Sequence, residues 1–326
     1  MKISLLGGGR WGVALSCHLG RLGHEILVYD RNESVVKLIN EGIHPYIEGI
    51  SLKNVRATHY LEDIEKYSNY VLIALPVQAI REIIGRLDLS KKKVISASKG
   101  LEIGTYKRVS QIIKEIHNSA QVFCLSGPSF ASEVSKGLPT ALVLAGEDHE
   151  QIRKIRDIFF SENFRIYLST DIVGVELGGA LKNVIAIACG ISDGLGYGEN
   201  ARASLMTRGL TEMVRIGVKV GAKRETFYGL SGMGDLFLTA SSTQSRNRTF
   251  GFMIGKGTPP QKAFEEIGQV VEGAYTVKAV KKLSDHLDVY APISEAVYKI
   301  VVEGEDLKSV VKSLLLRPPK DEFETI

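Results

Sequence analysis

The stretch Ile3-Ser4-Leu5-Leu6-Gly7-Gly8-Gly9-Arg10-Trp11-Gly12 opens the chain and is followed by an apolar run of helical spacing and by Glu25-Ile26-Leu27-Val28-Tyr29-Asp30. The order is strand, glycine-rich turn, helix, strand and acidic end. Gly7, Gly9 and Gly12 fit the pattern G-x-G-x-x-G, which in this context predicts a dinucleotide site. The first glycine allows a tight turn, the second lets the backbone approach a pyrophosphate, and the third lets the helix pack on the sheet. The helix N-terminus then offers unpaired N–H groups to the phosphates.

The acidic end of this stretch bears on the kind of dinucleotide. Asp30 stands about 20 residues after the glycines, where a carboxylate can accept hydrogen bonds from ribose hydroxyls. Arg31 follows it and could cover an adenine face or pair with a 2′-phosphate, although a solvated loop cation is the better interpretation of Arg31 by itself. The pair therefore leaves NAD and NADP both open.

The composition is that of an ordinary soluble globular protein, with 326 residues, 44% hydrophobic residues, 24% charged residues and a formal net charge of +4. The length suggests two domains, and the mild charge does not indicate a nucleic-acid surface. Cys17, Cys124 and Cys189 are scattered in apolar contexts, as expected for reduced core residues of a cytoplasmic protein. The chain opens on a strand, so we expect no signal peptide, and no uncharged run reaches about 18 residues, so we expect no membrane span.

Apolar strands and helices alternate through the first half of the chain. Strands are expected at 70–75, 93–97, 122–125, 140–145 and 164–168, which predicts a Rossmann-type, doubly wound and mostly parallel sheet. Ligands of such sheets bind outside the carboxyl ends of the strands, where Lys99 and the turn Ser126-Gly127-Pro128-Ser129 lie. A surface lysine and plain turn chemistry are the simpler interpretations of these two features.

We expect a dinucleotide-binding domain over 1–175 and an all-helical substrate-binding domain over 176–326. In the second, the segment from Gly178 to Cys189 is almost wholly apolar or small, with Lys182 and Asn183 as exceptions. A helix this apolar is buried, and burial favours the neutral form of a lysine. Lys182 is thus a candidate proton donor and acceptor near neutral pH, or else a lysine that extends to water. The glycine-rich segment 190–200 is expected to be a loop.

Two further polar features mark the second half. Asp235 follows the glycine-dense turn at 229–234 and is either a helix N-cap or an acid that faces Lys182. Thr243-Gln244-Ser245-Arg246-Asn247-Arg248 gathers donors that suit a phosphate, although a polar helix start explains it equally well. Leu314-Leu315-Leu316 is expected in a core or interface helix. Walker A, metal-ligand and G-x-S-x-G patterns are not satisfied, so neither a metal nor those chemistries are expected.

The chain resembles the family of bacterial-type NAD(P)-dependent glycerol-3-phosphate dehydrogenases over nearly its whole length. The matching segments occur in the family's order and rough spacing, and they are Gly7–Gly12, Ser98–Gly100, Gly127–Ala131, Ala180–Val184, Thr207–Leu210, Gly232–Leu236, Ser245–Asn247 and Val270–Gly273. The resemblance implies reversible reduction of dihydroxyacetone phosphate to sn-glycerol 3-phosphate, which supplies glycerophospholipid synthesis.

The resemblance also implies roles for individual residues. Lys182 would be the general acid and base, Lys99 would lend positive charge beside substrate and cofactor, and Asp235 would hold substrate and orient Lys182. Substrate would also contact Gly127, Ser129, Ser245, Arg246 and Asn247, the last three at its phosphate. The cofactor site would comprise Gly7, Gly9, Arg10, Trp11, Gly12, Asp30, Arg31, Lys99, Ala131, Arg246, Val270 and Glu272. Several family members carry no acid at the position of Asp30, and this acid would repel a 2′-phosphate. We therefore expect use of NAD, or dual use with NAD favoured over NADP.

Two other hypotheses remain at this point. One is a related two-domain dehydrogenase of a hydroxy acid or sugar acid, which would give no reason for the Ser245-Arg246-Asn247 donors. The other is a non-catalytic dinucleotide sensor, which would be indifferent to loss of Lys182. A homodimer is the expectation from the base rate of symmetric assemblies.

Overall fold

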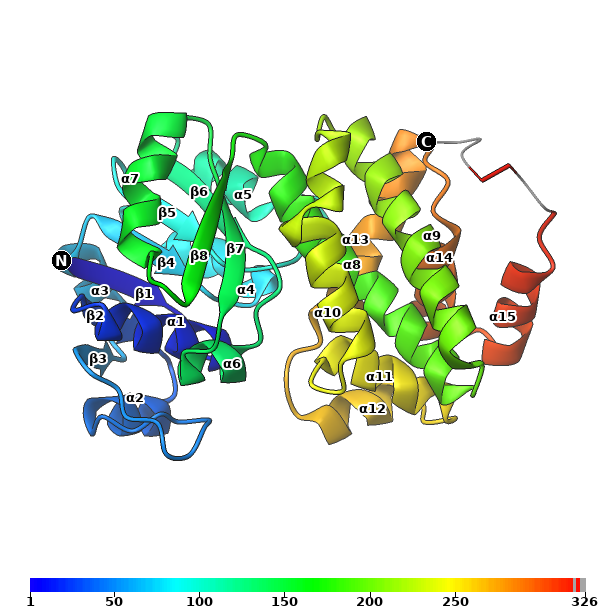
Figure 1. Cartoon of the computed structure of the whole chain (residues 1–326), viewed down its shortest axis with the longest axis horizontal. Coiled ribbons are helices and arrows are strands. Elements are labelled where there is room, and N and C mark those ends of the chain that lie inside the picture. Colours follow the sequence, from blue (N-terminus) through cyan, green and yellow to red (C-terminus); the bar gives the residue numbers. More distant parts are fainter. Residues whose placement is uncertain (319–320, 323–326) are drawn as a thin grey trace. The chain divides into compact units, whose positions relative to one another are not determined.

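The computed structural model describes residues 1–318 and 321–322, and the chain divides into two compact units (Figure 1). The first unit comprises Met1–Ser98 and Val109–Ile172, and the second comprises Lys99–Arg108 and Val173–Ile326. The second unit's main part thus begins close to the predicted boundary at residue 175. It also takes in Lys99–Arg108, which the sequence placed in the first domain.

The first unit is built on an eight-stranded sheet in the order β3-β2-β1-β4-β5-β6-β7-β8, with the β6–β7 pair antiparallel and the other pairs parallel. This confirms the predicted doubly wound, mostly parallel sheet. The strands are β1 Lys2–Leu6, β2 Glu25–Tyr29, β3 Val55–Thr58, β4 Tyr70–Ile73, β5 Lys93–Ser96, β6 Gln121–Ser126, β7 Thr140–Ala145 and β8 Phe164–Ser169.

Helices cover both faces of this sheet, which explains why its strands are nearly continuous apolar runs (Figure 1). One hydrophobic cluster joins the sheet to α1, α2, α6 and α7, and another joins it to α3, α4 and α5. These helices are α1 Arg10–Arg21, α2 Glu33–Asn40, α3 Leu61–Tyr67, α4 Val77–Ile84, α5 Val109–Ile116, α6 Ala131–Lys136 and α7 His149–Phe159.

The second unit is helical and is built around α8, Ile172–Gly194, whose residues are buried along nearly its whole length. The other helices are α9 Gly198–Lys219, α10 Asp235–Ser241, α11 Arg246–Gly255, α12 Pro260–Ile267, α13 Glu272–Leu287, α14 Pro292–Tyr298 and α15 Leu307–Leu315, with short helical turns at Arg224–Tyr228, Leu230–Gly234 and Lys299–Glu303. Among the described residues, α8 is long and apolar enough to cross a membrane, but 83% of the apolar 18-residue window within it is buried inside the protein.

The predicted loop at 190–200 is wrong except over 195–197, because α8 continues to Gly194 and α9 begins at Gly198. Gly190 and Gly194 serve close packing instead of a turn. A Cβ on Gly190 would collide with the backbone oxygen of Arg248, and one on Gly194 with that of Phe252. Glycine in this part of α8 is therefore explained by the approach of the α11 backbone.

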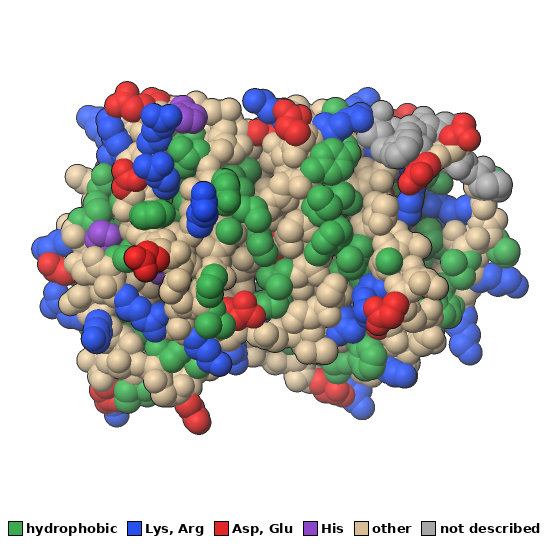
Figure 2. Space-filling model, viewed as in Figure 1, with side chains coloured by type: hydrophobic (Ala, Val, Ile, Leu, Met, Phe, Trp, Pro, Cys, Tyr) green, Lys and Arg blue, Asp and Glu red, His purple; other side chains and the backbone are tan. Residues whose placement is uncertain are grey.

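The surface and the cysteines agree with the composition. Lys and Arg side chains are interspersed with Asp and Glu side chains on the face drawn in Figure 2, as the net charge of +4 leads one to expect. Cys17, Cys124 and Cys189 are free and buried.

Leu315 and Leu316, at the end of α15, are 68% and 72% exposed, so these two do not lie in the core of the chain as described.

Candidate functional site

The glycine-rich turn has the geometry that a pyrophosphate requires. Gly7 follows β1 with a φ of 109°, a conformation that favours glycine. A Cβ on Gly12 would collide with the Gly7 carbonyl oxygen, so α1 packs directly against the turn. Apart from Gly9 itself and its two chain neighbours, no described atom lies within 4 Å of the place that a Cβ on Gly9 would take, and α1 begins at the next residue. The N-terminus of α1 therefore faces open space bounded by backbone, which fits a dinucleotide phosphate.

The side chains around this turn are held by the first unit. Tyr46 Oη donates to the Gly8 carbonyl at 2.8 Å, and the Arg10 guanidinium lies 5.6 Å from the centre of the Tyr46 ring. Trp11 Nε1 donates to the Ala97 carbonyl at 3.2 Å, at the end of β5. These contacts tie the start of α1 to the carboxyl edge of the sheet.

Asp30 lies beside the same turn, directly after β2. A Cβ on Gly8 would lie 2.8 Å from Asp30 Oδ2, while Asp30 Oδ1 accepts the Asn32 N–H at 2.8 Å. Arg31, the next residue, is exposed. The structure thus places a carboxylate next to the glycines, as the ribose interpretation of Asp30 requires.

The turn after β6 provides the other predicted residues of the first unit. Gly127 has a φ of 135°, and its carbonyl accepts a hydrogen bond from Ser129 Oγ at 3.0 Å. Ala131 begins α6. The turn follows a strand that pairs with the carboxyl end of β5 in parallel, so it lies at the edge where such sheets bind ligands.

Lys182 lies in the middle of α8, and its side chain is 8% exposed. Its Nζ donates to Thr239 Oγ1 at 2.6 Å and lies 3.0 Å from Asp235 Oδ1. Burial lowers the pKa of Lys182 to about 8, and the nearby positive charges of Lys99 and Arg246 also lower it. The carboxylate of Asp235 has the opposite effect and raises this pKa. The ammonium and the amine are therefore both accessible near neutral pH.

Asp235 joins two ammonium groups, because its Oδ2 accepts from Lys99 Nζ at 2.7 Å while Oδ1 faces Lys182. Its side chain is 2% exposed, and the Lys99 side chain is 17% exposed. Burial acts to raise the pKa of Asp235, but Lys182 and Lys99 outweigh it and hold that pKa below its usual range. The expected proximity of Lys182, Lys99 and Asp235 is thus found, with Asp235 as the first residue of α10.

The residues predicted to bind a phosphate lie at the start of α11. Ser245 is the N-cap, and its Oγ accepts the Arg248 N–H at 3.2 Å, while its hydroxyl hydrogen can still be donated. Arg246 is exposed and is close enough to Lys182 for its charge to lower that lysine's pKa. The first N–H groups of a ten-residue helix and a guanidinium therefore gather near the buried ammonium.

Asn247 connects this helix start to two neighbours. Its Nδ2 donates to Asn183 Oδ1 at 2.9 Å, and its Oδ1 accepts the Gly273 N–H at 2.9 Å. Asn183 follows Lys182 in α8, and Gly273 follows Glu272, the first residue of α13. Val270 is 37% exposed just before α13, so the predicted cofactor residues Val270 and Glu272 lie beside the predicted phosphate residues.

Sequence reasoning missed two polar residues of this cluster. Thr239 follows Asp235 by one helical turn, so both face Lys182, and its hydroxyl also lies 3.3 Å from Asp235 Oδ1. Asn183 was visible as a polar residue in an apolar helix, but its amide partner Asn247 was not predictable from the pattern. In the described part of the chain, no group of three His, Cys, Asp or Glu residues could hold a metal ion.

A glycine-rich turn at the start of a doubly wound sheet, together with a buried lysine of lowered pKa in a helical second unit, defines a dinucleotide-dependent oxidoreductase. Profiles of the N-terminal and C-terminal parts of NAD-dependent glycerol-3-phosphate dehydrogenase match residues 2–152 and 171–312. The chain belongs to this family, which confirms the resemblance noted in its sequence.

Individual relatives agree with this assignment. The chain is 44% identical to glycerol-3-phosphate dehydrogenase [NAD(P)+] of Clostridium tetani, over 98% of this chain and 93% of the relative. It is 47% identical to the enzyme of the same name from Thermotoga sp. (strain RQ2), over 99% of each. The crystal structure of glycerol-3-phosphate dehydrogenase from Coxiella burnetii matches with a TM-score of 0.92 and 35% identity, over 97% of this chain and 99% of that one.

Proposed function

We propose that the protein catalyses the reversible reduction of dihydroxyacetone phosphate to sn-glycerol 3-phosphate with NAD(P)H, and that the product supplies glycerophospholipid synthesis. The family assignment supports the reaction. The observation that carries the chemistry is the buried cluster of Lys182, Asp235, Thr239 and Lys99.

Lys182 is the proposed general acid of the reduction. An ammonium has three N–H groups, and Thr239 and Asp235 take two of them, which leaves one for a substrate oxygen. Bound nicotinamide supplies a hydride to the carbonyl carbon. Lys182 gives its proton to the oxygen that gains negative charge, and in the oxidation its neutral amine takes that proton back. A pKa of about 8 suits both directions.

Asp235 and Lys99 are proposed to support this proton transfer electrostatically. The carboxylate of Asp235 holds both ammonium groups in place, and the three side chains together carry a net charge of +1. A positive charge fixed in advance stabilises the oxygen that becomes negative in the transition state. Asp235 would also hold a substrate hydroxyl.

The substrate phosphate is proposed to bind at the start of α11, through Ser245, Arg246 and Asn247, with Gly127 and Ser129 contacting the rest of the substrate. A helix N-terminus and a guanidinium are both suited to a phosphate. Because dihydroxyacetone phosphate offers little apolar surface, its phosphate must contribute most of the binding energy.

The cofactor is proposed to bind at the glycine-rich turn, through Gly7, Gly9, Arg10, Trp11 and Gly12, with Asp30 and Arg31 at the adenosine ribose. Ala131, Lys99, Arg246, Val270 and Glu272 would complete its site. Residues 1–175 would then serve as the dinucleotide-binding domain and 176–326 as the substrate-binding domain. We further propose a preference for NAD, because the carboxylate of Asp30 lies beside Gly8, and we propose a cytoplasmic homodimer.

The test is an assay of NADH oxidation with dihydroxyacetone phosphate, repeated with unphosphorylated dihydroxyacetone. We expect turnover of the phosphorylated ketone, and a kcat/KM at least a hundredfold lower without the phosphate, equivalent to about 3 kcal/mol. Cofactor binding without turnover would favour a dinucleotide sensor. Equal rates with the two ketones would favour a dehydrogenase of another hydroxy compound.

A further inference from the structure

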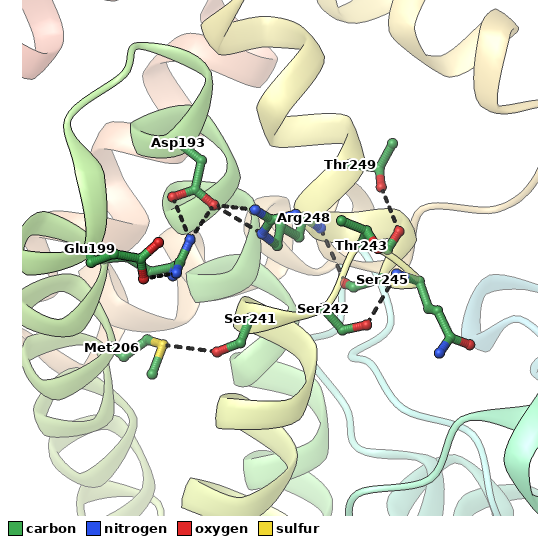
Figure 3. A network of polar contacts seen from close by, with 11 residues as sticks. Asp193, Glu199, Met206, Ser241, Ser242, Thr243, Ser245, Arg248 and Thr249 are labelled. Carbon is green, nitrogen blue, oxygen red and sulfur yellow. Dashed lines mark hydrogen bonds and ion pairs between the residues drawn. The ribbon is translucent and has the colours of Figure 1, made fainter.

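A buried carboxylate near the end of α8 holds the start of α11. Asp193 Oδ2 accepts from Arg248 Nε at 2.9 Å and lies 2.6 Å from Arg248 Nη2 (Figure 3). The Asp193 side chain is 8% exposed and that of Arg248 is 13% exposed. A charge pair this well buried has a definite geometry, and loss of Asp193 would leave the Arg248 guanidinium without its buried carboxylate.

The same carboxylate is held in turn from α9. Arg202 Nη1 lies 3.0 Å from Asp193 Oδ1 and 3.2 Å from Oδ2, and Arg202 also pairs with the exposed carboxylate of Glu199. Asp193 thus binds a second guanidinium in addition to that of Arg248. Asp193 of α8 is therefore held by guanidinium groups from both α9 and α11.

The backbones of α8 and α11 approach closely over the same region. Cβ atoms on Gly190 and Gly194 of α8 would collide with the α11 backbone, and Cβ atoms on Gly251 and Gly255 of α11 would collide with the α8 backbone. Asn183, Ile187, Gly190 and Gly194 are spaced so that they form one face of α8. This face bears Asn183, which binds Asn247, at one end and the Gly190–Gly194 crossing at the other.

Lys182 therefore belongs to the same rigid helix that sets the position of α11. The Asp193–Arg248 pair acts on the third residue of α11, next to the proposed phosphate residues Ser245, Arg246 and Asn247. The two arginines of this segment thus have different surroundings. Arg248 is bound to a buried carboxylate, whereas Arg246 lies at the exposed helix start and acts electrostatically on Lys182.

We infer that the Asp193–Arg248 pair positions the phosphate-binding start of α11 relative to Lys182, and that Asp193 and Arg248 are therefore positioning residues for the phosphorylated substrate. This inference rests on the proposed function of the site. Arg248 does not itself bind the phosphate, since its guanidinium is directed at Asp193. The pair acts on affinity for the phosphate group and leaves the proton transfer by Lys182 unchanged.

The experiment compares wild type with Asp193→Asn, Arg248→Lys and Arg248→Met, using NADH with dihydroxyacetone phosphate and with dihydroxyacetone. We expect Asp193→Asn and Arg248→Met to lower kcat/KM for the phosphorylated ketone by roughly 10- to 100-fold, mainly through KM, because a small displacement of a binding group costs this much. The kcat/KM for dihydroxyacetone should stay at its wild-type value. Arg248→Lys, which keeps the charge, should give a smaller loss.

Two controls separate positioning from simple loss of structure. Glu199→Gln breaks the exposed end of the same network and should leave both kcat/KM values unchanged. The double variant Asp193→Asn/Arg248→Met should lose no more than either single variant, because both remove one interaction. Thermal denaturation and NADH titration of each variant measure the folded fraction to which the rates refer.

The outcomes distinguish this inference from the function on which it rests. If wild type prefers the phosphorylated ketone and the variants keep that preference, the inference is wrong and the proposed function stands. The inference is also wrong if the folded variants lose activity equally with both ketones. A wild-type protein without the preference overturns the proposed phosphate site and the inference together.

Discussion

Lys182 is stable as a buried cation because Asp235 faces it, yet Asp235 divides its two oxygens between Lys182 and Lys99. Burial disfavours the charge on Lys182 and lowers its pKa, whereas the carboxylate of Asp235 raises it. Because Asp235 is shared with Lys99, it offsets only part of the effect of burial, and the pKa of Lys182 is about 8 instead of its ordinary value of 10.5. The ammonium of Lys182 therefore titrates close to neutral pH.

Replacing Lys182 tests this role directly. Lys182→Ala should lower kcat by roughly a thousandfold or more, since it removes the proton donor, while the affinity for NADH should stay unchanged. Steady-state kinetics and NADH titration measure the two quantities. Lys262→Ala, on an exposed face of α12, is the matched control and should change neither. An Lys182→Ala enzyme with wild-type kcat would exclude Lys182 as the acid.

The pH dependence should differ in sign between the two directions. Reduction needs the ammonium of Lys182, so its kcat should fall as the pH rises through about 8, and oxidation needs the amine, so its kcat should rise there. Asp235 raises the pKa of Lys182. Asp235→Asn should therefore move both midpoints to lower pH in the activity that remains. Profiles with the same sign in both directions would argue against Lys182.

At the level of elements, the crossing of α8 and α11 depends on glycine at four positions. Gly190→Ala should lower the free energy of unfolding by about 1–3 kcal/mol, because the new methyl group forces the two backbones apart. Chemical denaturation measures this change. Gly85→Ala is the control, at the exposed end of α4 with a φ of −65°, and should change stability by less than about 0.5 kcal/mol. Equal effects of the two changes would show that the crossing tolerates a side chain.

The packing of α9 on α14 contains a buried carboxylate with a pH-dependent contribution. Glu212 Oε2 accepts from the N–H of Ser294 at 3.1 Å and from its hydroxyl at 3.0 Å, and the N–H of Ile293 also binds this carboxylate. Burial raises the pKa of Glu212 to about 7 against these donors. Glu212 should therefore favour the folded state most below its unfolded pKa of 4.5 and lose this effect as the pH rises to about 7.

The resulting prediction is a decrease in stability toward neutral pH. Between pH 4.5 and 7, this group should lower the free energy of unfolding by about 3 kcal/mol as the pH rises. Urea denaturation across this range measures the slope. Glu212→Gln removes the titration and should flatten the curve by that amount. A wild-type curve as flat as that of Glu212→Gln would show that the carboxylate is equally ionised in the folded and unfolded states.

The sequence predicts an element correctly where its residue pattern has only one structural explanation. Covered strands such as β4 and β7 are continuous apolar runs, and the glycine turn precedes α1 as expected. β3 went unrecognised because its four residues include exposed Arg56. The end of α8 was misjudged because glycine signals both turns and close packing, and only the position of α11 distinguishes them.

The candidate site shows a similar division. The resemblance placed Lys182, Lys99 and Asp235 together, and the structure agrees. Thr239 could have been found from its spacing, one turn after Asp235. The contacts of Asn247 with Asn183 and Gly273, and of Arg248 with Asp193, join helices distant in sequence, so local pattern does not reveal them.

For the whole molecule, we expect the carboxylate of Asp30 to influence the choice between NAD and NADP. Asp30 lies beside Gly8, and we propose that its carboxylate accepts hydrogen bonds from ribose hydroxyls there and disfavours a 2′-phosphate. We expect kcat/KM for NADH to exceed that for NADPH, and Asp30→Ser should reduce this ratio by about tenfold or more. Parallel assays with the two cofactors measure it. A strong preference of the wild type for NADPH would overturn the assignment of Asp30.

The membership of Lys99–Arg108 in the second unit means that the two units cannot be separated by one cut in the gene. The polypeptide passes between them after Ser98, Arg108 and Ile172. A recombinant fragment ending at residue 175 would retain Leu101, which is fully buried in the helical core, and would expose it to water. The complementary fragment would lack Lys99 and leave Asp235 with one ammonium instead of two. Two fragments divided at residue 175 should therefore regain activity only if Lys99–Arg108 of the first fragment packs again into the helical unit of the second. The enzyme has two compact units, but neither corresponds to one continuous fragment of the chain.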